Sequence, residues 1–471
     1  MKDRELAFTP AWKLRNMLDI KDISPVELTE LYLRRIEEFN QHLNAYLTIT
    51  GDRALAEAKE AECRLMKGER GSLLGIPISI KDLELTEGVR TTMGSLIFKD
   101  TVPDRNSEVV SRVKKAGAIS LGKTNTPEFG LSGTTENRLG EACRNPWNIE
   151  RTSGGSSGGA AAAVVSGLCS IAIGSDGGGS IRIPSSFCGL FGIKPTLGRV
   201  PRVGGLGQPS PNLTSQTGPM ANNVKDAAMM LQVLAGYDSR DPISIKQPLG
   251  DIQTEMSEHM KSLKLCWSPD LGYAAVDPEV KQVAKAGALG FEELGCIVDE
   301  TSFALDYPME SFLAIFTTNA YVSYGKLYET QEDQLAKYTR DSMARGKSVT
   351  GAGYASALQE VQTIKGKLNS LMDEYDLLLT PTMAVPAFPV ELFPTHIAGR
   401  EVFPRWDYLP FTPVFNLSGQ PAASIPCGFS SDGMPIGLHI VGKWGQESTV
   451  MRAAYAFEQI RPWAQHKPHV S

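Results

Sequence analysis

Histidine, paired cysteines and long apolar runs are all scarce in this 471-residue chain. It has 6 histidines and 7 cysteines, and the cysteines stand singly, with no C-x-x-C pair. This spacing excludes the disulfide framework of a small secreted protein and the paired ligands of a zinc finger. The sequence shows no apolar run of about 18 residues and no signal-peptide pattern at its start, so we expect no membrane-spanning helix and a cytoplasmic location.

A basic surplus is also missing. The 47 lysines and arginines are outnumbered by 53 aspartates and glutamates, which gives a net charge of −6 with histidine neutral. Nucleic-acid-binding proteins usually carry a basic surplus on at least one segment, so we expect no nucleic-acid partner. With 42% hydrophobic and 21% charged residues, the composition is that of an ordinary globular protein.

Helical and strand periodicities alternate along the chain. The clearest helix start is Ser24-Pro25-Val26-Glu27, a capping box with proline at the first helical position. The predicted elements are helices at about 25–39, 54–68, 107–116 and 278–294, and strands at 76–80, 118–121 and 295–298. The glycine- and proline-rich stretch 198–219 is predicted as a loop within this pattern. Because no long linker interrupts the alternation, we predict a single α/β domain over residues 1–471.

Residues 117–124, GAISLGKT, match the nucleotide-binding pattern G-x-x-x-x-G-K-[ST] in full. A P-loop follows a strand and opens a helix, so that the amides at the helix start hold phosphates. Here a predicted helix precedes the match, and residues 118–121 are themselves strand-like. We therefore predict no nucleotide site. No metal or other cofactor is expected, because the sequence has no H-E-x-x-H pattern and no paired Cys/His spacing.

A glycine–serine run at 154–159, GGSSGG, matches the G-x-S-x-G nucleophile elbow of α/β-hydrolases in two overlapping registers. A triad of that kind needs a histidine, and none of the six lies in an obviously catalytic setting. Taken alone, such a run is most often a flexible loop. Cys169 and Cys188 are predicted as buried apolar residues, because no basic neighbour is evident to lower the pKa of either thiol.

The longer segment 154–189, GGSSGGAAAAVVSGLCSIAIGSDGGGSIRIPSSFCG, resembles the signature of the amidase signature family of Ser–Ser–Lys hydrolases. Further matches lie at 75–82 (GIPISIKD), 121–130, 144–148, 192–200, 215–221, 415–429 and 434–442, so the resemblance spans most of the chain. It implies a large twisted mixed β-sheet covered on both faces by helices. The activity it implies is hydrolysis of carboxamide C–N bonds through a serine acyl-enzyme.

Motif by motif, the resemblance places the family's catalytic lysine at Lys81, its bridging serine at Ser156 and its nucleophile at Ser180. It also implies a cis peptide bond between Gly155 and Ser156. These residue types suit the chemistry, because a serine oxygen needs a base to remove its proton and the departing nitrogen needs an acid. Lysine can act as the base only when neutral. Ser156, placed between Lys81 and Ser180, would relay the proton in both directions.

The turn around Ser180 is predicted to stabilise the reacting carbonyl. Negative charge that develops on that oxygen needs preorganised donors, and a glycine run offers backbone amides without Cβ atoms in the way. We predict an oxyanion hole from the amides of Gly177, Gly178, Gly179 and Ser180. Asp176 and Arg182 flank the turn and are predicted as a buried charge pair or brace, with a solvated loop pair as the alternative. Ser157 is expected to support the site.

The C-terminal part bears on the substrate. The family includes the glutaminase subunit of the tRNA-dependent amidotransferase, whose pattern D-x-x-T-x-P-x-N-L-A-G uses the aspartate to read glutamine's ammonium. Residues 409–419 read LPFTPVFNLSG, so Leu409 occupies the aspartate position, and Asp407 lies two residues away. Segment 302–325 is rich in aromatic and aliphatic residues and is predicted either as an apolar substrate wall or as a buried core helix.

We therefore predict a stand-alone hydrolase of amides or carbamates, anilide-like or urethane-like, with an apolar part. It would act on a small-molecule substrate as a monomer or homodimer, without a membrane or nucleic-acid partner. Two alternatives remain open: the glutaminase subunit of an amidotransferase complex, and a non-catalytic binding protein on the same fold. An intact set of Lys81, Ser156 and Ser180 disfavours the second alternative.

Overall fold

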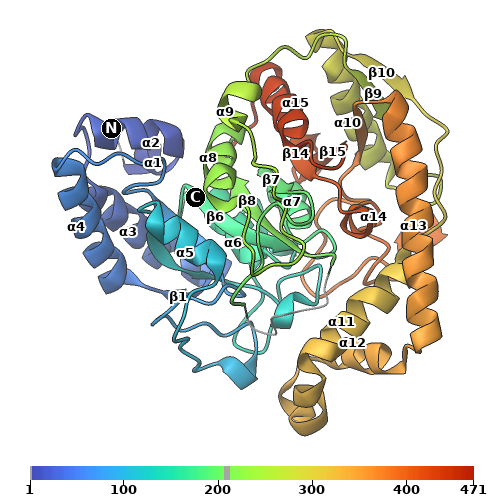
Figure 1. The fold of residues 1–471 in the computed structure, drawn as a ribbon, viewed down its shortest axis with the longest axis horizontal. Coiled ribbons are helices and arrows are strands. Elements are labelled where there is room, and N and C mark those ends of the chain that lie inside the picture. The colour runs from blue at the N-terminus through green and yellow to red at the C-terminus, as the bar shows by residue number, and fades with distance from the viewer. Residues whose placement is uncertain (1–2, 206–212) are drawn as a thin grey trace.

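The computed structural model describes residues 3–205 and 213–471, and its core is one large β-sheet (Figure 1). The strands of this sheet are β1 Tyr46–Ile49, β2 Pro77–Lys81, β3 Ile119–Thr124, β6 Ile171–Asp176, β7 Phe191–Lys194, β8 Gln216–Ala221, β9 Lys264–Trp267, β10 Ile297–Glu300, β11 Leu377–Pro381, β14 Ala422–Phe429 and β15 Pro435–Gly442. Within the described residues they form an 11-stranded sheet in the order β1-β3-β2-β6-β8-β7-β14-β15-β11-β9-β10. Two small hairpins lie outside it, β4 Arg144–Asn145 with β5 Asn148–Thr152, and β12 His396–Ile397 with β13 Arg400–Glu401.

Helices pack around the sheet. They are α1 Asp3–Ala7, α2 Ala11–Asp19, α3 Pro25–Leu43, α4 Gly51–Met66, α5 Glu108–Lys115, α6 Gly158–Val165, α7 Arg182–Cys188, α8 Val224–Leu234, α9 Ile252–Glu255, α10 Pro278–Leu289, α11 Met309–Thr330, α12 Lys337–Ser348, α13 Gly351–Glu374, α14 Thr412–Ser418 and α15 Glu447–Ile460. Figure 1 shows α1–α4 on one side of the molecule and α10 and α13 on the other, with the sheet between them. Helices α8 and α15 contact each other and pack on β8 and β15, while α6 and α7 form a second contacting pair on β6, β14 and β15.

The predicted α/β class is confirmed, and so is the clearest helix start. Helix α3 begins at the capping box, where Ser24 Oγ accepts from the Glu27 amide at 3.0 Å and the Ser24 amide donates to Glu27 Oε2 at 2.8 Å. It runs beyond the predicted end at residue 39 and stops at Leu43, followed by Asn44 with a left-handed φ of 53°. The remaining predicted helices and strands are present with shifts of a few residues at their ends.

The prediction of a loop over residues 198–219 is wrong for its last residues. Gln216–Ala221 is strand β8, and its residues pair with β6 in the antiparallel register Asp176↔Gln216 to Ile171↔Ala221. Pairing along β6 therefore overrides the weak strand propensity of glycine and proline here. Residues 206–212 of the predicted loop lie outside the described residues. The predicted helix 278–294 likewise divides into α10 and a 3₁₀ turn at Gly290–Leu294.

The direction of two central strands positions the site. Strand β2 is parallel to β6, with Ile78 opposite Ile171 and Ile80 opposite Ile173. The carboxyl ends of neighbouring parallel strands meet at the same edge of a sheet. Lys81, at the end of β2, therefore lies beside the turn that follows β6.

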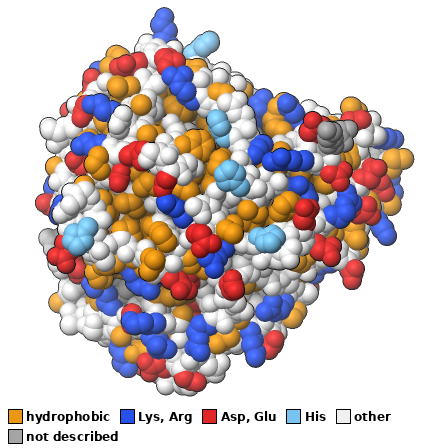
Figure 2. Space-filling view, turned by 180° about the vertical axis from the view of Figure 1, so that it is seen from behind, with side chains coloured by type: hydrophobic (Ala, Val, Ile, Leu, Met, Phe, Trp, Pro, Cys, Tyr) orange, Lys and Arg blue, Asp and Glu red, His pale blue; other side chains and the backbone are white. Residues whose placement is uncertain are grey.

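The outer surface is mixed in character. On the face in Figure 2, basic and acidic side chains are interspersed, and apolar side chains are scattered between them. None of the described helices combines the length and the apolar character that crossing a bilayer would require.

Candidate active site

Lys81 is fully buried at the end of β2. Its Nζ donates to Ser156 Oγ at 2.7 Å and to Ser157 Oγ at 2.8 Å. Burial lowers the pKa of Lys81 from 10.5 to about 7, against the opposing charges of Asp176 and Glu84. A substantial fraction of this lysine is therefore neutral near pH 7 and able to accept a proton.

The two serines come from the turn that opens α6. The Gly155–Ser156 peptide bond is cis, as the resemblance implies. Ser157 is the residue before the first turn of α6, and its amide donates to the Ser180 carbonyl at 3.1 Å. Its hydroxyl also lies 3.2 Å from the Ser175 carbonyl. Ser157 therefore forms hydrogen bonds to Lys81, to the turn that carries Ser180 and to the end of β6.

Ser180 lies in the turn between β6 and α7. Gly179 has a φ of 123°, and a Cβ there would lie 2.2 Å from Thr412 Oγ1, so this position requires glycine. The Gly179 amide donates to Asp176 Oδ1 at 2.7 Å. Because the Gly179 amide already donates to Asp176, we remove it from the predicted oxyanion hole. The amides of Gly177, Gly178 and Ser180 remain the predicted donors.

Asp176 and Arg182 form a buried ion pair, which excludes the solvated alternative. Arg182 Nε donates to Asp176 Oδ2 and Nη2 donates to Oδ1, both at 2.9 Å, and both side chains are fully buried. Burial alone would raise the pKa of Asp176, but the charge of Arg182 and hydrogen bonds from Arg182 and Asn416 outweigh it and hold the pKa well below its ordinary value. Because Asp176 also accepts from the Gly179 amide, the pair fixes the turn that carries Ser180.

His439 is a neighbour of this pair that sequence reasoning missed. It is buried on β15, and its Nε2 lies 3.0 Å from Arg182 Nη1. Burial, reinforced by the charge of Arg182, holds the pKa of His439 well below its ordinary value, so its imidazole is neutral. No local motif signals this contact, because β15 follows Arg182 by more than two hundred residues.

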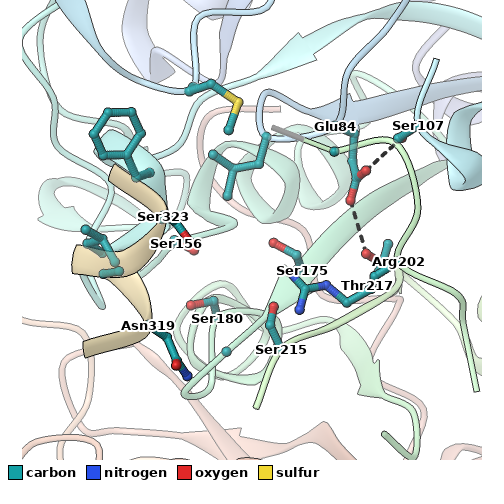
Figure 3. Close-up of a pocket in the computed structure, with 18 of the residues that line it drawn as sticks. Glu84, Ser107, Ser156, Ser175, Ser180, Arg202, Ser215, Thr217, Asn319 and Ser323 are labelled. Atoms are coloured by element: carbon teal, nitrogen blue, oxygen red, sulfur yellow. Dashed lines mark hydrogen bonds between the residues drawn. The ribbon is translucent and has the colours of Figure 1, made fainter. Parts of the chain in front are cut away.

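Ser156 and Ser180 line one cavity of about 130 Å³. Figure 3 places both serines between the Asn319 and Ser323 side of α11 and the opposite side, where Glu84 and Arg202 lie. The residues of α11 that line the cavity are Phe316, Asn319, Ala320, Ser323 and Tyr324. Other residues of the same helix, such as Phe312 and Ile315, are buried in the core. Segment 302–325 therefore supplies both the cavity wall and a core helix.

The opposite, polar wall was also missed by sequence reasoning. Glu84 accepts from Ser107 Oγ at 2.8 Å and from Thr217 Oγ1 at 3.1 Å, as the dashed lines in Figure 3 show. Arg202 lines the same cavity. The sequence did hold one signal for Glu84. It follows Lys81 by three residues, so it lies at the edge of the sheet where β2 ends.

The P-loop match is a strand, as predicted. Residues 119–124 form β3, and Lys123 is fully buried, 3.9 Å from Asp82. Its Nζ donates to Thr91 Oγ1 at 3.0 Å and to the Glu84 carbonyl, so its hydrogen bonds are used inside the protein. In the described part of the chain no group of three or more His, Cys, Asp or Glu side chains could hold a metal ion. All seven cysteines are free, and burial raises the pKa of Cys169 to about 12.

The position that would read glutamine's ammonium is apolar. Leu409 is buried, with 1% of its surface exposed. Asp407 does not line the cavity of Ser156 and Ser180, and it accepts from the Tyr307 hydroxyl and from the Phe403 amide. Asp407 lines a separate cavity, together with Tyr273 and Tyr307.

Known proteins match this chain over nearly its whole length. The family model described as Amidase matches residues 27–451. An acylamidase of Rhodococcus erythropolis is 35% identical, over 99% of this chain and 98% of that protein. A glutamyl-tRNA(Gln) amidotransferase subunit from Thermosynechococcus vestitus is 38% identical, over 97% of this chain and 99% of that protein. A solved structure of a bacterial aryl acylamidase of the amidase signature family superposes with a TM-score of 0.91 at 29% identity, covering 97% of each chain.

The family match over residues 27–451 and the superposition on a solved aryl acylamidase place the chain in a class of hydrolases that act on C–N bonds. The chain belongs to the amidase signature family.

Proposed function

We propose that the protein is a stand-alone amidase that cleaves carboxamides or carbamates, anilide-like or urethane-like, through an acyl-enzyme on Ser180. The observation that carries the proposal is the 2.7 Å contact between Lys81 Nζ and Ser156 Oγ, at a cavity that Ser180 also lines. A buried lysine with a lowered pKa, beside two hydroxyls, supplies a base where the sequence offers no catalytic histidine.

In the proposed reaction, neutral Lys81 accepts the proton of Ser156, and Ser156 accepts the proton of Ser180. The Ser180 oxygen attacks the carbonyl carbon, and the amides of Gly177, Gly178 and Ser180 stabilise the charge on the carbonyl oxygen. When the C–N bond breaks, the proton returns through Ser156 to the departing nitrogen. Water then attacks the acyl-enzyme by the same route and releases the acid.

The walls of the cavity support a substrate with an apolar part. Helix α11 contributes Phe316, Ala320 and Tyr324 to these walls. Met93, between β2 and α5, and Phe129, in a 3₁₀ turn after β3, also line the cavity. The similar acylamidase and aryl acylamidase also support this choice of substrate. A buried Leu409 in place of the aspartate disfavours glutamine at this site. We further propose that the protein works as a monomer or homodimer without a second kind of chain.

The alternative function is the glutaminase subunit of an amidotransferase, which the 38% identical protein of Thermosynechococcus vestitus supports. A hydrolysis panel separates the two: acetanilide, a phenyl carbamate, butanamide and L-glutamine, with Ser180→Ala as the inactive control. The proposal expects turnover of an anilide or carbamate by the purified chain alone. Turnover restricted to glutamine, or dependent on a copurifying second chain, would establish the alternative instead.

A further inference from the structure

Glu84 presents a carboxylate to the catalytic cavity. It lies in the loop after β2, three residues beyond Lys81, and lines the cavity with Ser107 and Thr217. These two hydroxyls come from the start of α5 and from β8, and each donates to a different carboxylate oxygen. Each of those oxygens can accept more than one hydrogen bond, so the carboxylate is held in place while keeping capacity for another donor.

The charges around Glu84 leave it without a full counter-charge. Among the described residues, no side-chain nitrogen of a lysine, arginine or histidine lies within 4.0 Å of a carboxylate oxygen of Glu84. Lys123 donates to the backbone carbonyl of Glu84 and lies 3.9 Å from Asp82, and it interacts with the Glu84 charge only at longer range. Lys81 is neutral in the form that accepts a proton. The positive charge nearest to Glu84 in the cavity wall is therefore Arg202.

Arg202 is shared between two carboxylates. It interacts electrostatically with Glu84 and with Asp241, and its own backbone amide donates to Asp241 Oδ2 at 2.9 Å. Because Arg202 also interacts with Asp241, its charge offsets that of Glu84 only in part. A carboxylate that is partly withdrawn from water is stabilised most by a cation that can also donate hydrogen bonds.

We propose that Glu84 binds a protonated amine carried by the non-reacting part of the substrate, so that the preferred substrates are amides or carbamates of amine-bearing molecules. The ammonium would donate to Glu84, and the methylene chain that carries it would lie against the apolar side of the cavity, at Phe129 and Tyr324. This inference rests on the proposed hydrolase function, because it specifies which amides that site prefers.

The test compares substrates that differ only in an ammonium and a methyl group. One series places the amine on the acyl side, 4-aminobutanamide against pentanamide, and the other places it on the leaving group, N-(3-aminopropyl)butanamide against N-butylbutanamide. A carboxylate analogue, glutaric acid monoamide, completes the set. At about pH 8.5, where an alkyl ammonium is still charged, the wild-type kcat/KM for the aminated member of at least one series should exceed that of its methyl partner by about 10- to 100-fold.

Glu84→Gln should remove most of this ratio, and Glu84→Asp should keep part of it. The matched control is Glu87→Gln, because Glu87 is exposed in the same loop and outside the cavity, and this variant should keep the wild-type ratio. A ratio near one in both series, or an unchanged ratio in Glu84→Gln, would overturn the inference. Preference for glutaric acid monoamide would also overturn it, and would assign the cavity to an anion at Arg202.

A binding measurement tests this inference independently of the proposed function. Calorimetric titration of Ser180→Ala with 4-aminobutanamide and pentanamide, and with the second pair of ligands, needs no turnover. Tighter binding of an aminated ligand by about 10-fold supports the inference even if the wild-type chain hydrolyses none of these amides. Equal binding within both pairs refutes it even if every amide in the panel is hydrolysed.

Discussion

The Nζ of Lys81 lies 2.7 Å from Ser156 Oγ and 2.8 Å from Ser157 Oγ, so one buried amine holds both serines of the loop before α6. The hydroxyls come from residues 75 and 76 positions further along the chain, and the parallel pairing of β2 with β6 brings the lysine to them. Burial opposes the charge on this amine, while Asp176 and Glu84 favour it, and the balance sets the pKa near 7.

The pH dependence of kcat/KM should follow Lys81. In the proposed mechanism the neutral amine is the base, so the rate should rise as pH increases through about 7 and level off on the alkaline side. Lys81→Ala should lose about 10²- to 10⁴-fold in kcat/KM and lose this ionisation from its profile. Lys123→Ala, which removes another buried lysine, should keep the midpoint even if it lowers stability. A Lys81→Ala profile with the wild-type midpoint at reduced amplitude would assign the general base to another group.

Covalent labelling should fall on Ser180. Treatment with a fluorophosphonate, digestion and mass spectrometry should place the adduct on the peptide that contains Ser180, because this serine adjoins the amides of Gly177 and Gly178. Ser180→Ala should abolish labelling while leaving the thermal unfolding curve close to wild type. An adduct on Ser156 or Ser157 would reverse the assignment of nucleophile and bridge.

The ion pair between Asp176 and Arg182 should be important for stability. Replacing either partner, by Asp176→Asn or Arg182→Met, should lower the free energy of unfolding by about 3–5 kcal/mol in urea titrations, because it leaves the other group buried and uncompensated. Asp341→Asn is the matched control, since the Lys337–Asp341 pair is exposed, and it should change this energy by less than about 1 kcal/mol.

The same pair makes an acid-sensitive contribution. The pKa of Asp176 is lower in the folded chain than in the unfolded chain, where it is near 3.9. Its stabilisation is therefore fully present above about pH 4 and is lost as pH falls further towards the folded value. Wild-type stability should drop over this range by more than that of Asp176→Asn, and parallel acid curves for the two proteins would contradict the assignment.

The sequence predicted the parts of the site that are held in short motifs. The resemblance to short family motifs singled out Lys81 and the serine loop, which the structure brings into contact, and the pairing of Asp176 with Arg182 was predicted from their position around the turn. The geometry of Gly179 was not predictable, because its amide is taken by Asp176, and only the folded turn shows which amides stay free.

The sequence also could not predict contacts between distant segments, because only the folded chain shows which segments meet. Asn416 on α14 and His439 on β15 contact Arg182 from more than two hundred residues away, and Thr217 contacts Glu84 from β8, which β6 separates from β2 in the sheet. Each of these residues is ordinary in its local context, and its role depends on strand order rather than on any motif. The start of β8 was missed because its glycine and proline argue for a loop, whereas pairing with β6 decides the outcome.

Ser156 and Ser157 should differ in their effect on the reaction although both contact Lys81. Ser156 lines the cavity, whereas the Ser157 amide donates to the Ser180 carbonyl and its hydroxyl also contacts the Ser175 carbonyl. Ser156→Ala removes the proposed relay and one buried hydrogen bond to Lys81, so kcat should fall by about 10²- to 10⁴-fold and the free energy of unfolding by about 1 kcal/mol. Ser157→Ala keeps the backbone contact with Ser180 and removes the hydrogen bonds of its hydroxyl to Lys81 and Ser175, so the free energy of unfolding should fall by about 1–3 kcal/mol while kcat falls much less than in Ser156→Ala. Single-turnover kinetics and urea unfolding of the two variants check this, and equal losses of kcat would show that the two hydroxyls share the relay.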